Sequence, residues 1–156
     1  MAEEKMERAQ KVYMTLCATL EAHDWHYEKN DERLIVECKA KGEDLPIDIT
    51  IKVDEDRQLL MLLSHLPFTI SEDKRLDVAI ATSIVNNDLV DGSFDYDITS
   101  GTMFFRMTNS FLESDISGEL LFHQLMLSCH IIDLYNDKFL MLTKGLIGIE
   151  DFVHKK

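Results

Sequence analysis

The chain has 156 residues, with 16 lysines and arginines against 29 aspartates and glutamates, which gives a net charge of −13. This length fits one domain over residues 1–156, large enough to bury a core without a disulfide or a metal ion. A composition of 46% hydrophobic and 29% charged residues excludes a disordered chain. Binding to nucleic acid or to an anionic membrane surface needs clustered lysine and arginine, so the acidic balance opposes both.

The expected location is the cytoplasm. The first residues lack the basic and apolar regions of a secretory signal, and no apolar run is long enough to span a membrane. The three cysteines, Cys17, Cys38 and Cys129, are odd in number and widely separated. This spacing argues against a disulfide framework and favours a reducing compartment.

The first half of the chain predicts one helix and then strands. Apolar residues recur at steps of three and four over residues 4–23, which is the spacing of one helical stripe. An extended stretch at 25–27 precedes strands at 34–40, 47–53 and 59–63. Residues 47–53 alternate between apolar and polar, whereas 59–63 have no polar face. The strand at 59–63 is therefore either covered on both sides, or its outer face meets a partner.

A second helix, predicted from Ser71 to about residue 89, carries two apolar stripes. The first stripe consists of Leu76, Ala79, Ile80 and Ile84. The second stripe consists of Val78, Ala81, Val85 and Leu89. Two stripes are more apolar surface than one small sheet covers, so we expect a homodimer. The small residues of the second stripe allow close backbone approach, so this stripe is the expected interface.

The last third of the chain predicts a hairpin and a long helix. Residues 94–98 and 103–108 form the two arms, joined by a turn that ends at Gly101. Ser117 caps the last helix, which is apolar nearly all round, and Gly145 ends it. The order αβββαββα, with antiparallel strands beside helices, predicts an α+β fold.

No pattern of glycine, serine or carboxylate residues marks a phosphate loop, a dinucleotide site, a nucleophile elbow or an EF-hand. His23 and His26 lie close in sequence but have no evident third ligand, so a metal site is not expected. Asp95 and Asp97 share one face of a strand, where solvent exposure explains them as well as acid–base chemistry does. No catalytic residue, metal or cofactor is therefore expected. The alternative is a small metal-dependent or hydrolytic enzyme built around His23, His26 or the carboxylates of Asp95 and Asp97.

One stretch of the sequence carries a family pattern. An alternating strand from Leu45-Pro46, an aspartate-rich turn and an apolar strand ending in Leu66-Pro67-Phe68 precede a helix that opens with SEDKRLDVA. The pattern continues through Ile84-Val85-Asn86-Asn87, Gly92 to Asp97 and Met103 to Arg106. Over roughly residues 5–142 the chain resembles the bacterial YbjN family of sensory transduction regulators.

The resemblance implies a fold like that of type III secretion chaperones, with a twisted antiparallel sheet flanked by helices, usually in a homodimer. Those chaperones are small, acidic, cytosolic and non-catalytic, and they hold non-globular segments of other proteins. This sequence departs from the pattern after Leu142. The role of the extension at residues 143–156 is open, including whether it covers the surface that chaperones use for partners.

The expected function is therefore a non-catalytic, chaperone-like or regulatory module that binds segments of an unidentified protein. A structural subunit of a larger complex is a further alternative. The hairpin at 94–107 is the expected site, particularly Phe104 and Met107, because Met103 and Phe105 supply its core-facing side. Alternatively, Phe104 and Met107 pack beneath a helix of the same chain. The net charge of −13 would steer basic segments toward the site.

Overall fold

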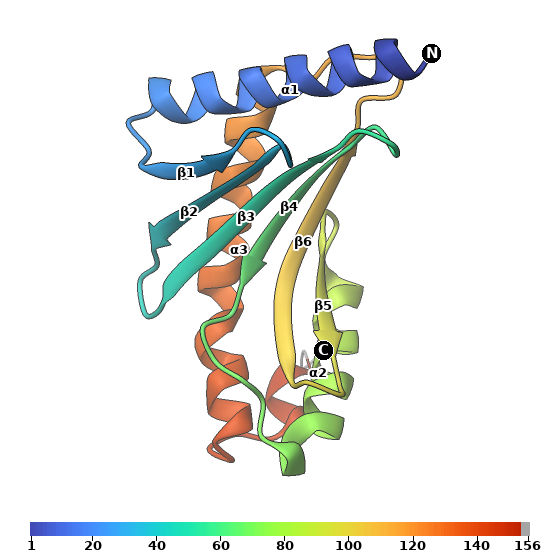
Figure 1. Cartoon of the computed structure of the whole chain (residues 1–156). Coiled ribbons are helices and arrows are strands. Elements are labelled where there is room, and N and C mark those ends of the chain that lie inside the picture. The colour runs from blue at the N-terminus through green and yellow to red at the C-terminus, as the bar shows by residue number, and fades with distance from the viewer. Residues whose placement is uncertain (154–156) are drawn as a thin grey trace.

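The computed structural model describes residues 1–153 and places every predicted helix and strand (Figure 1). In chain order the elements are α1 (Ala2–Ala22), β1 (Tyr27–Asn30), β2 (Ile35–Lys41), β3 (Pro46–Asp54), β4 (Leu59–His65), the 3₁₀ turn η1 (Glu72–Lys74), α2 (Arg75–Asp88), β5 (Ser93–Asp97), β6 (Thr102–Ser110), α3 (Gly118–Thr143) and the 3₁₀ turn η2 (Ile149–Phe152). The predicted α+β class is confirmed. The extended stretch after α1 forms an additional short strand, β1.

All neighbouring strands are antiparallel and form one six-stranded sheet in the order β1-β2-β3-β4-β6-β5. The first four strands follow one another as hairpins. The chain then leaves the sheet through α2 and returns with the β5–β6 hairpin, whose second arm pairs with β4. As a result β4 lies inside the sheet, and β1 and β5 are its two edges.

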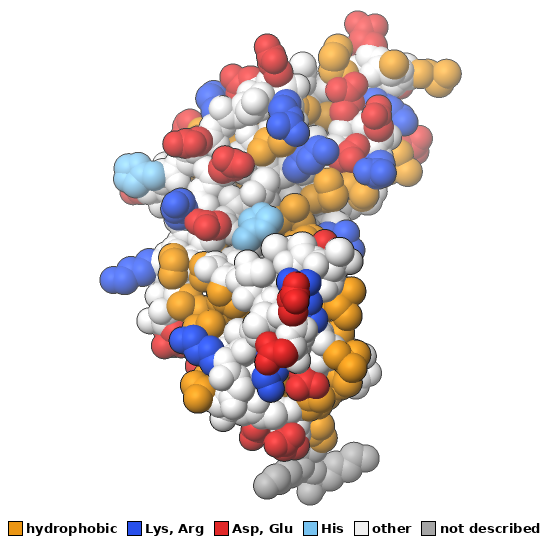
Figure 2. Space-filling view, turned by 60° about the horizontal axis from the view of Figure 1, so that its bottom comes forward, with side chains coloured by type: hydrophobic (Ala, Val, Ile, Leu, Met, Phe, Trp, Pro, Cys, Tyr) orange, Lys and Arg blue, Asp and Glu red, His pale blue; other side chains and the backbone are white. Residues whose placement is uncertain are grey.

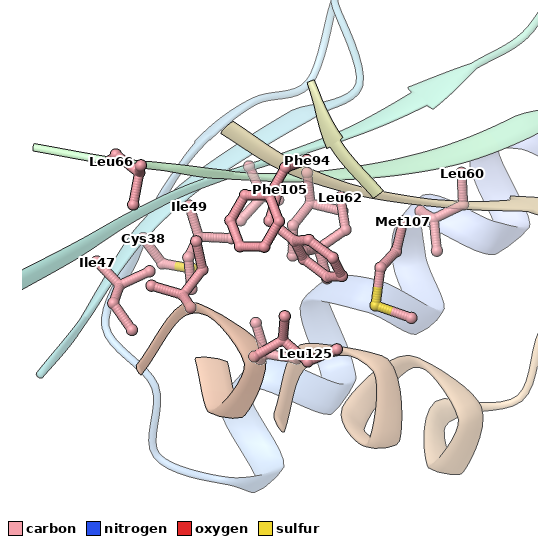
Figure 3. Close-up of a cluster of buried hydrophobic side chains, with 14 of the residues drawn as sticks. Cys38, Ile47, Ile49, Leu60, Leu62, Leu66, Phe94, Phe105, Met107 and Leu125 are labelled. Atoms are coloured by element: carbon pink, nitrogen blue, oxygen red, sulfur yellow. The ribbon is translucent and has the colours of Figure 1, made fainter. Parts of the chain in front are cut away.

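The core lies on one face of this sheet. The apolar residues of the alternating strand β3, from Ile47 to Val53, are all buried, as predicted. Leu60 and Leu62 of β4 are buried on the same side, and Figure 3 shows them pointing toward Leu125 of α3. In that view α1 and α3 lie on the side to which these residues point.

Helix α3 begins and ends as its sequence predicts. The hydroxyl of Ser117 accepts a hydrogen bond of 3.1 Å from the backbone N–H of Leu120. At the other end Gly145 has a φ of +72°, and its N–H donates to the carbonyl of Leu142. The N–H of Leu146 donates to the carbonyl of Met141, which completes a left-handed glycine cap.

Helix α2 turns its second apolar stripe toward the core. The dimer prediction had placed this stripe on the outside, against a second copy. Val78 and Ala81 are fully buried, Val85 is 2% exposed, and half-buried Leu89 packs against the core. The expectation that this stripe faces a second copy is therefore corrected, because small side chains let α2 approach the sheet closely. The outward residues are instead Leu76, 67% exposed, and Ile80, 42% exposed, both from the first stripe.

The described part of the extension, up to Val153, packs on the helical side of the molecule. Turn η2 contacts α2. Phe152 is buried, with its ring centroid 5.3 Å from that of Phe139 in α3 and the Lys138 Nζ 4.9 Å above it. These contacts place the extension away from the opposite face of the sheet.

Candidate functional site: the uncovered face of the sheet

The face of the sheet that points away from the helices carries an apolar strip at its centre. Leu59, Met61 and Leu63 of β4 point to this side, and all three are half-buried. Phe104 of β6, also half-buried, lies nearby on the same face. Within residues 1–153 no helix lies over this face of strands β4 and β6 (Figure 1). We call Leu59, Met61 and Leu63 the open-face strip.

The strand register places cations directly beside the open-face strip. Met61 pairs with Lys52 on β3, and Leu63 pairs with Arg106 on β6. Cross-strand pairs of this kind have neighbouring side chains on one face of the sheet. Arg57, in the turn between β3 and β4, stands at the Leu59 end of the strip. The strip is therefore apolar along its length and has charged side chains of both signs along its margins, because Asp54 pairs with Leu59 across the strands.

Two carboxylates pair with these arginines. Asp54 accepts hydrogen bonds from the Arg57 backbone N–H at 2.9 Å and from Arg57 Nη1 at 3.1 Å. The backbone hydrogen bond is the main cause that lowers the pKa of Asp54, which keeps this buried carboxyl ionised. Arg106 Nη2 lies 2.9 Å from Asp95 Oδ2. These pairs fix the guanidinium groups at the margin of the strip.

A hollow of about 590 Å³ lies over one end of the strip. Its lining combines Leu59 and Met61 with both arginines and with the α2–β5 loop around Asp91. A second hollow, of about 640 Å³, lies over β1, β2 and β3. The sheet therefore has two hollows that a bound chain can occupy.

The two residues chosen from the sequence fall on opposite faces of β6. Phe104 lies on the uncovered face, with its ring centroid 5.7 Å from that of His65. Met107 is only 2% exposed and points into the core with Met103 and Phe105. The placement of Met107 beside Phe104 was wrong, because residues three apart on a strand point to opposite sides.

The structure does not bring together the four residues of the enzymatic alternative. His23 stacks on Phe122 of α3, with ring centroids 3.6 Å apart. His26 lines the second hollow. Asp95 pairs with Arg106, and Asp97 accepts hydrogen bonds from Thr99 and Ser100 in the hairpin turn. Residues 1–153 contain no group of three His, Cys, Asp or Glu side chains arranged to hold a metal ion.

The cysteine thiols are disfavoured as nucleophiles by their surroundings. Burial raises the pKa of Cys38 to about 12 and that of Cys129 to about 11. Burial is also the main cause that raises the pKa of Cys17. A nucleophilic thiol needs the opposite shift, because only the thiolate attacks.

The sequence analysis missed the cations beside the strip and the outward residues of α2. Lys52 and Arg106 flank the strip only through the strand register, which sequence does not fix. The uniformly apolar run at 59–63 did carry a signal. One of its two interpretations, an outer face available to a partner, matches the exposure of this face in the structure.

Comparison with known proteins supports the fold. No family model matches the chain, and no curated protein sequence matches it. Among solved structures, YbjN from E. coli has a TM-score of 0.58 at 11% identity, over 78% of this chain and 86% of its own. The HopA1–SchA chaperone–effector complex matches with a TM-score of 0.52 at 15% identity, over 80% and 91% of the two chains. The ExsC–ExsE complex matches with 0.58 at 14% identity, over 81% and 92%.

The fold predicted from the resemblance, that of YbjN and of type III secretion chaperones, is thereby confirmed. None of the helices in the described part of the chain combines the length and hydropathy that a membrane span requires.

Proposed function

We propose that this protein is a non-catalytic, chaperone-like interaction module of the cytoplasm that binds a segment of another protein on the uncovered face of its sheet. The observation that carries the proposal is the open-face strip, which is apolar, lies at the centre of the sheet and has no helix over it within residues 1–153. An open sheet face with apolar residues at its centre favours a second packed layer. The likeness in fold to one chain of a chaperone–effector complex supports the same reading.

The free edge of the sheet offers a second point of attachment. At the β5 edge, the side chain of Asn86 in α2 donates to the carbonyl of Phe94 at 3.0 Å and accepts from its N–H at 2.8 Å. The β1 edge has no such side-chain pairing among residues 1–153. An extended segment of the partner can therefore add as a strand at β1 while another part lies on the face.

The test is affinity purification of the tagged chain from its native lysate, with partners identified by mass spectrometry. Phe104→Glu places a charge on the uncovered face and is expected to lose the partner while the protein stays folded. Thr102→Glu is the matched control, because Thr102 is exposed on the same face of β6 but lies beyond the end of β4, farther from the strip than Phe104. If Phe104→Glu keeps every wild-type partner, the site is wrong. If the wild type captures no protein, the interaction function itself falls.

We also propose a homodimer that packs through the outward residues of α2. Leu76 and Ile80 expose apolar surface on one side of this helix. Figure 2 turns the α2 end of the molecule toward the viewer and shows hydrophobic side chains gathered along its margins. A twofold axis through α2 would bury Leu76 and Ile80 of both copies at once.

Sedimentation equilibrium tests the dimer. The wild type is expected at twice the 18.0 kDa chain mass, and Ile80→Asp at 18.0 kDa with unchanged helix content. Val90→Asp is the control, because Val90 is fully exposed and lies beyond the end of α2. A wild type of 18.0 kDa at micromolar concentration contradicts the dimer.

A further inference from the structure

We infer that the segment added at the β1 edge is an extended chain in which basic and apolar side chains alternate. The inference rests on the proposed function and specifies the chemistry of the partner at this edge. The basic side chains face the uncovered side of the sheet, beside Glu28 of β1, and the apolar side chains face α1. Successive side chains of a strand point to opposite faces, so one segment serves both sides.

The backbone of β1 is free along one side. β1 pairs only with β2, in a register that matches Tyr27 with Cys38 and Glu28 with Glu37. Within residues 1–153 no group outside β2 forms a hydrogen bond to the β1 backbone. The edge therefore offers main-chain donors and acceptors to an added strand. Because β1 is four residues long, about four residues of the partner pair with it, two on each face.

On the uncovered face, two carboxylates stand opposite each other without a paired cation. Glu28 and Glu37 are cross-strand partners, and like charges at such positions destabilise a sheet. Neither has an ion-pair partner in the described part of the chain. Lys39, on the same face, lies 3.8 Å from Asp48, and Lys52 of β3 lies one cross-strand pair further along. A lysine or arginine beside Glu28 on an added strand supplies the missing positive charge.

The hollow of about 640 Å³ over this part of the sheet is acidic when all its charged lining is counted. Glu28, Glu37 and Asp48 contribute three negative charges and Lys39 one positive charge, which leaves −2 with His26 neutral. The sign agrees with the net charge of −13 of the whole chain. Electrostatic complementarity therefore favours a basic segment over an acidic one.

On the other side of β1, a hollow of about 420 Å³ lies between this edge and α1. Its apolar lining consists of Met14, Cys17, Ala18 and Leu34. Met14 is 71% exposed, so the single chain leaves apolar surface open here. The two carboxylates of this lining already have partners. Asp31 accepts a hydrogen bond from the Tyr13 hydroxyl at 2.9 Å, and Glu21 accepts one from Tyr27 at 2.6 Å. An apolar side chain therefore suits this side better than a charged one.

The experiment measures the affinity of the full chain for three synthetic peptides by fluorescence anisotropy. Each has about eight residues, the length of an ordinary strand. The first alternates lysine and valine, the second alternates glutamate and valine, and the third groups the lysines and valines of the first into two blocks. The first is expected to bind about tenfold tighter than the second, since two attractive contacts replace two repulsive ones. The third, which has the charge of the first, is expected to bind about threefold more weakly than the first, because no four of its residues suit both sides.

Variants of the protein locate the effect. Glu28→Lys is expected to abolish or invert the preference for lysine over glutamate. The matched control is Glu32→Lys, which changes the net charge equally at an exposed turn position outside both hollows and is expected to keep the preference. Circular dichroism checks the folding of both. If Glu28→Lys does not fold, the neutral Glu28→Gln is expected to reduce the preference by about threefold.

The apolar side is tested on α1. Met14→Gln is expected to weaken both alternating peptides equally and to leave the preference for lysine unchanged. Met6→Gln, at an exposed position of the same helix outside the hollow, is expected to change neither affinity.

Equal affinity for the lysine and glutamate peptides, equal affinity for the alternating and grouped peptides, or binding of none overturns the inference. So does a Glu32→Lys variant that shifts the preference as much as Glu28→Lys does, or a Met14→Gln variant that binds like the wild type. The proposed function fails separately, through the Phe104→Glu purification. Loss of the native partner in Phe104→Glu together with equal peptide affinities would leave the function standing and remove only the alternating segment.

Discussion

The two faces of β4 show how one apolar strand serves two environments. Leu60 and Leu62 point toward α3 and are at most 2% exposed. Leu59, Met61 and Leu63 point the other way and remain half-buried, and within residues 1–153 no helix lies over that face of β4. Their side chains are as apolar as those of the core. The comparison teaches that hydrophobicity in this strand extends beyond what the fold of a single chain requires.

The largest expected effect separates the two faces directly. Leu62→Ala is expected to lower the free energy of unfolding by about 2–5 kcal/mol, because it leaves a cavity against α3. Leu63→Ala, one residue further on the open side, is expected to cost about 1 kcal/mol or less. Urea denaturation of both variants measures the difference. Equal losses would mean that another molecule covers the open face in solution.

An intermediate loss of stability is expected at the β5 edge of the sheet, where Asn86 of α2 pairs with the backbone of Phe94. Asn86→Ala removes both hydrogen bonds to the Phe94 backbone and is expected to cost about 2 kcal/mol. Faster hydrogen exchange at the Phe94 amide should accompany the loss. Asn87→Ala, at an exposed position beside it, is the control and should have little effect. Unchanged exchange at Phe94 would show that the edge is protected by other contacts.

The smallest expected effect concerns Asp54, a buried carboxylate at the end of the open-face side of β3. Its pKa in the folded state lies below its ordinary value of 3.8, so its stabilising contribution is present above that pH. The contribution is lost as the pH falls through the folded-state pKa. Asp54→Asn is therefore expected to cost about 1 kcal/mol at pH 7 and progressively less in acid. A cost that is the same at pH 7 and pH 2 would contradict this assignment.

Much of the fold could be predicted because the strand and helix patterns are local. The alternation of residues 47–53 identified the buried side of β3 correctly. The signals at Ser117 and Gly145 marked both ends of α3. Each of these depends on neighbours within one turn of helix or one pair of strand residues.

The stripe of α2 that faces the core was predicted wrongly because both stripes of the helix are apolar. Helix α2 has two apolar stripes, and the smaller residues, Val78 and Ala81, face the core because α2 packs closely beside the β5 edge. Periodicity alone does not distinguish such stripes. For Met107 the sequence was sufficient, since the alternation of β6 already places it with Met103 and Phe105. The cations beside the strip depend on the register of three strands and were beyond sequence analysis.

The pairing of Asn86 with Phe94 also limits how this molecule can assemble. Growth of a sheet from subunit to subunit needs two free edges on each subunit, as in fibrils. Here the Phe94 backbone on the β5 edge is already paired with an amide side chain of the same chain, which leaves β1 as the more open edge. Two copies that meet at β1 use the open edge of both, so the sheet favours pairing at this edge over stepwise growth from one subunit to the next.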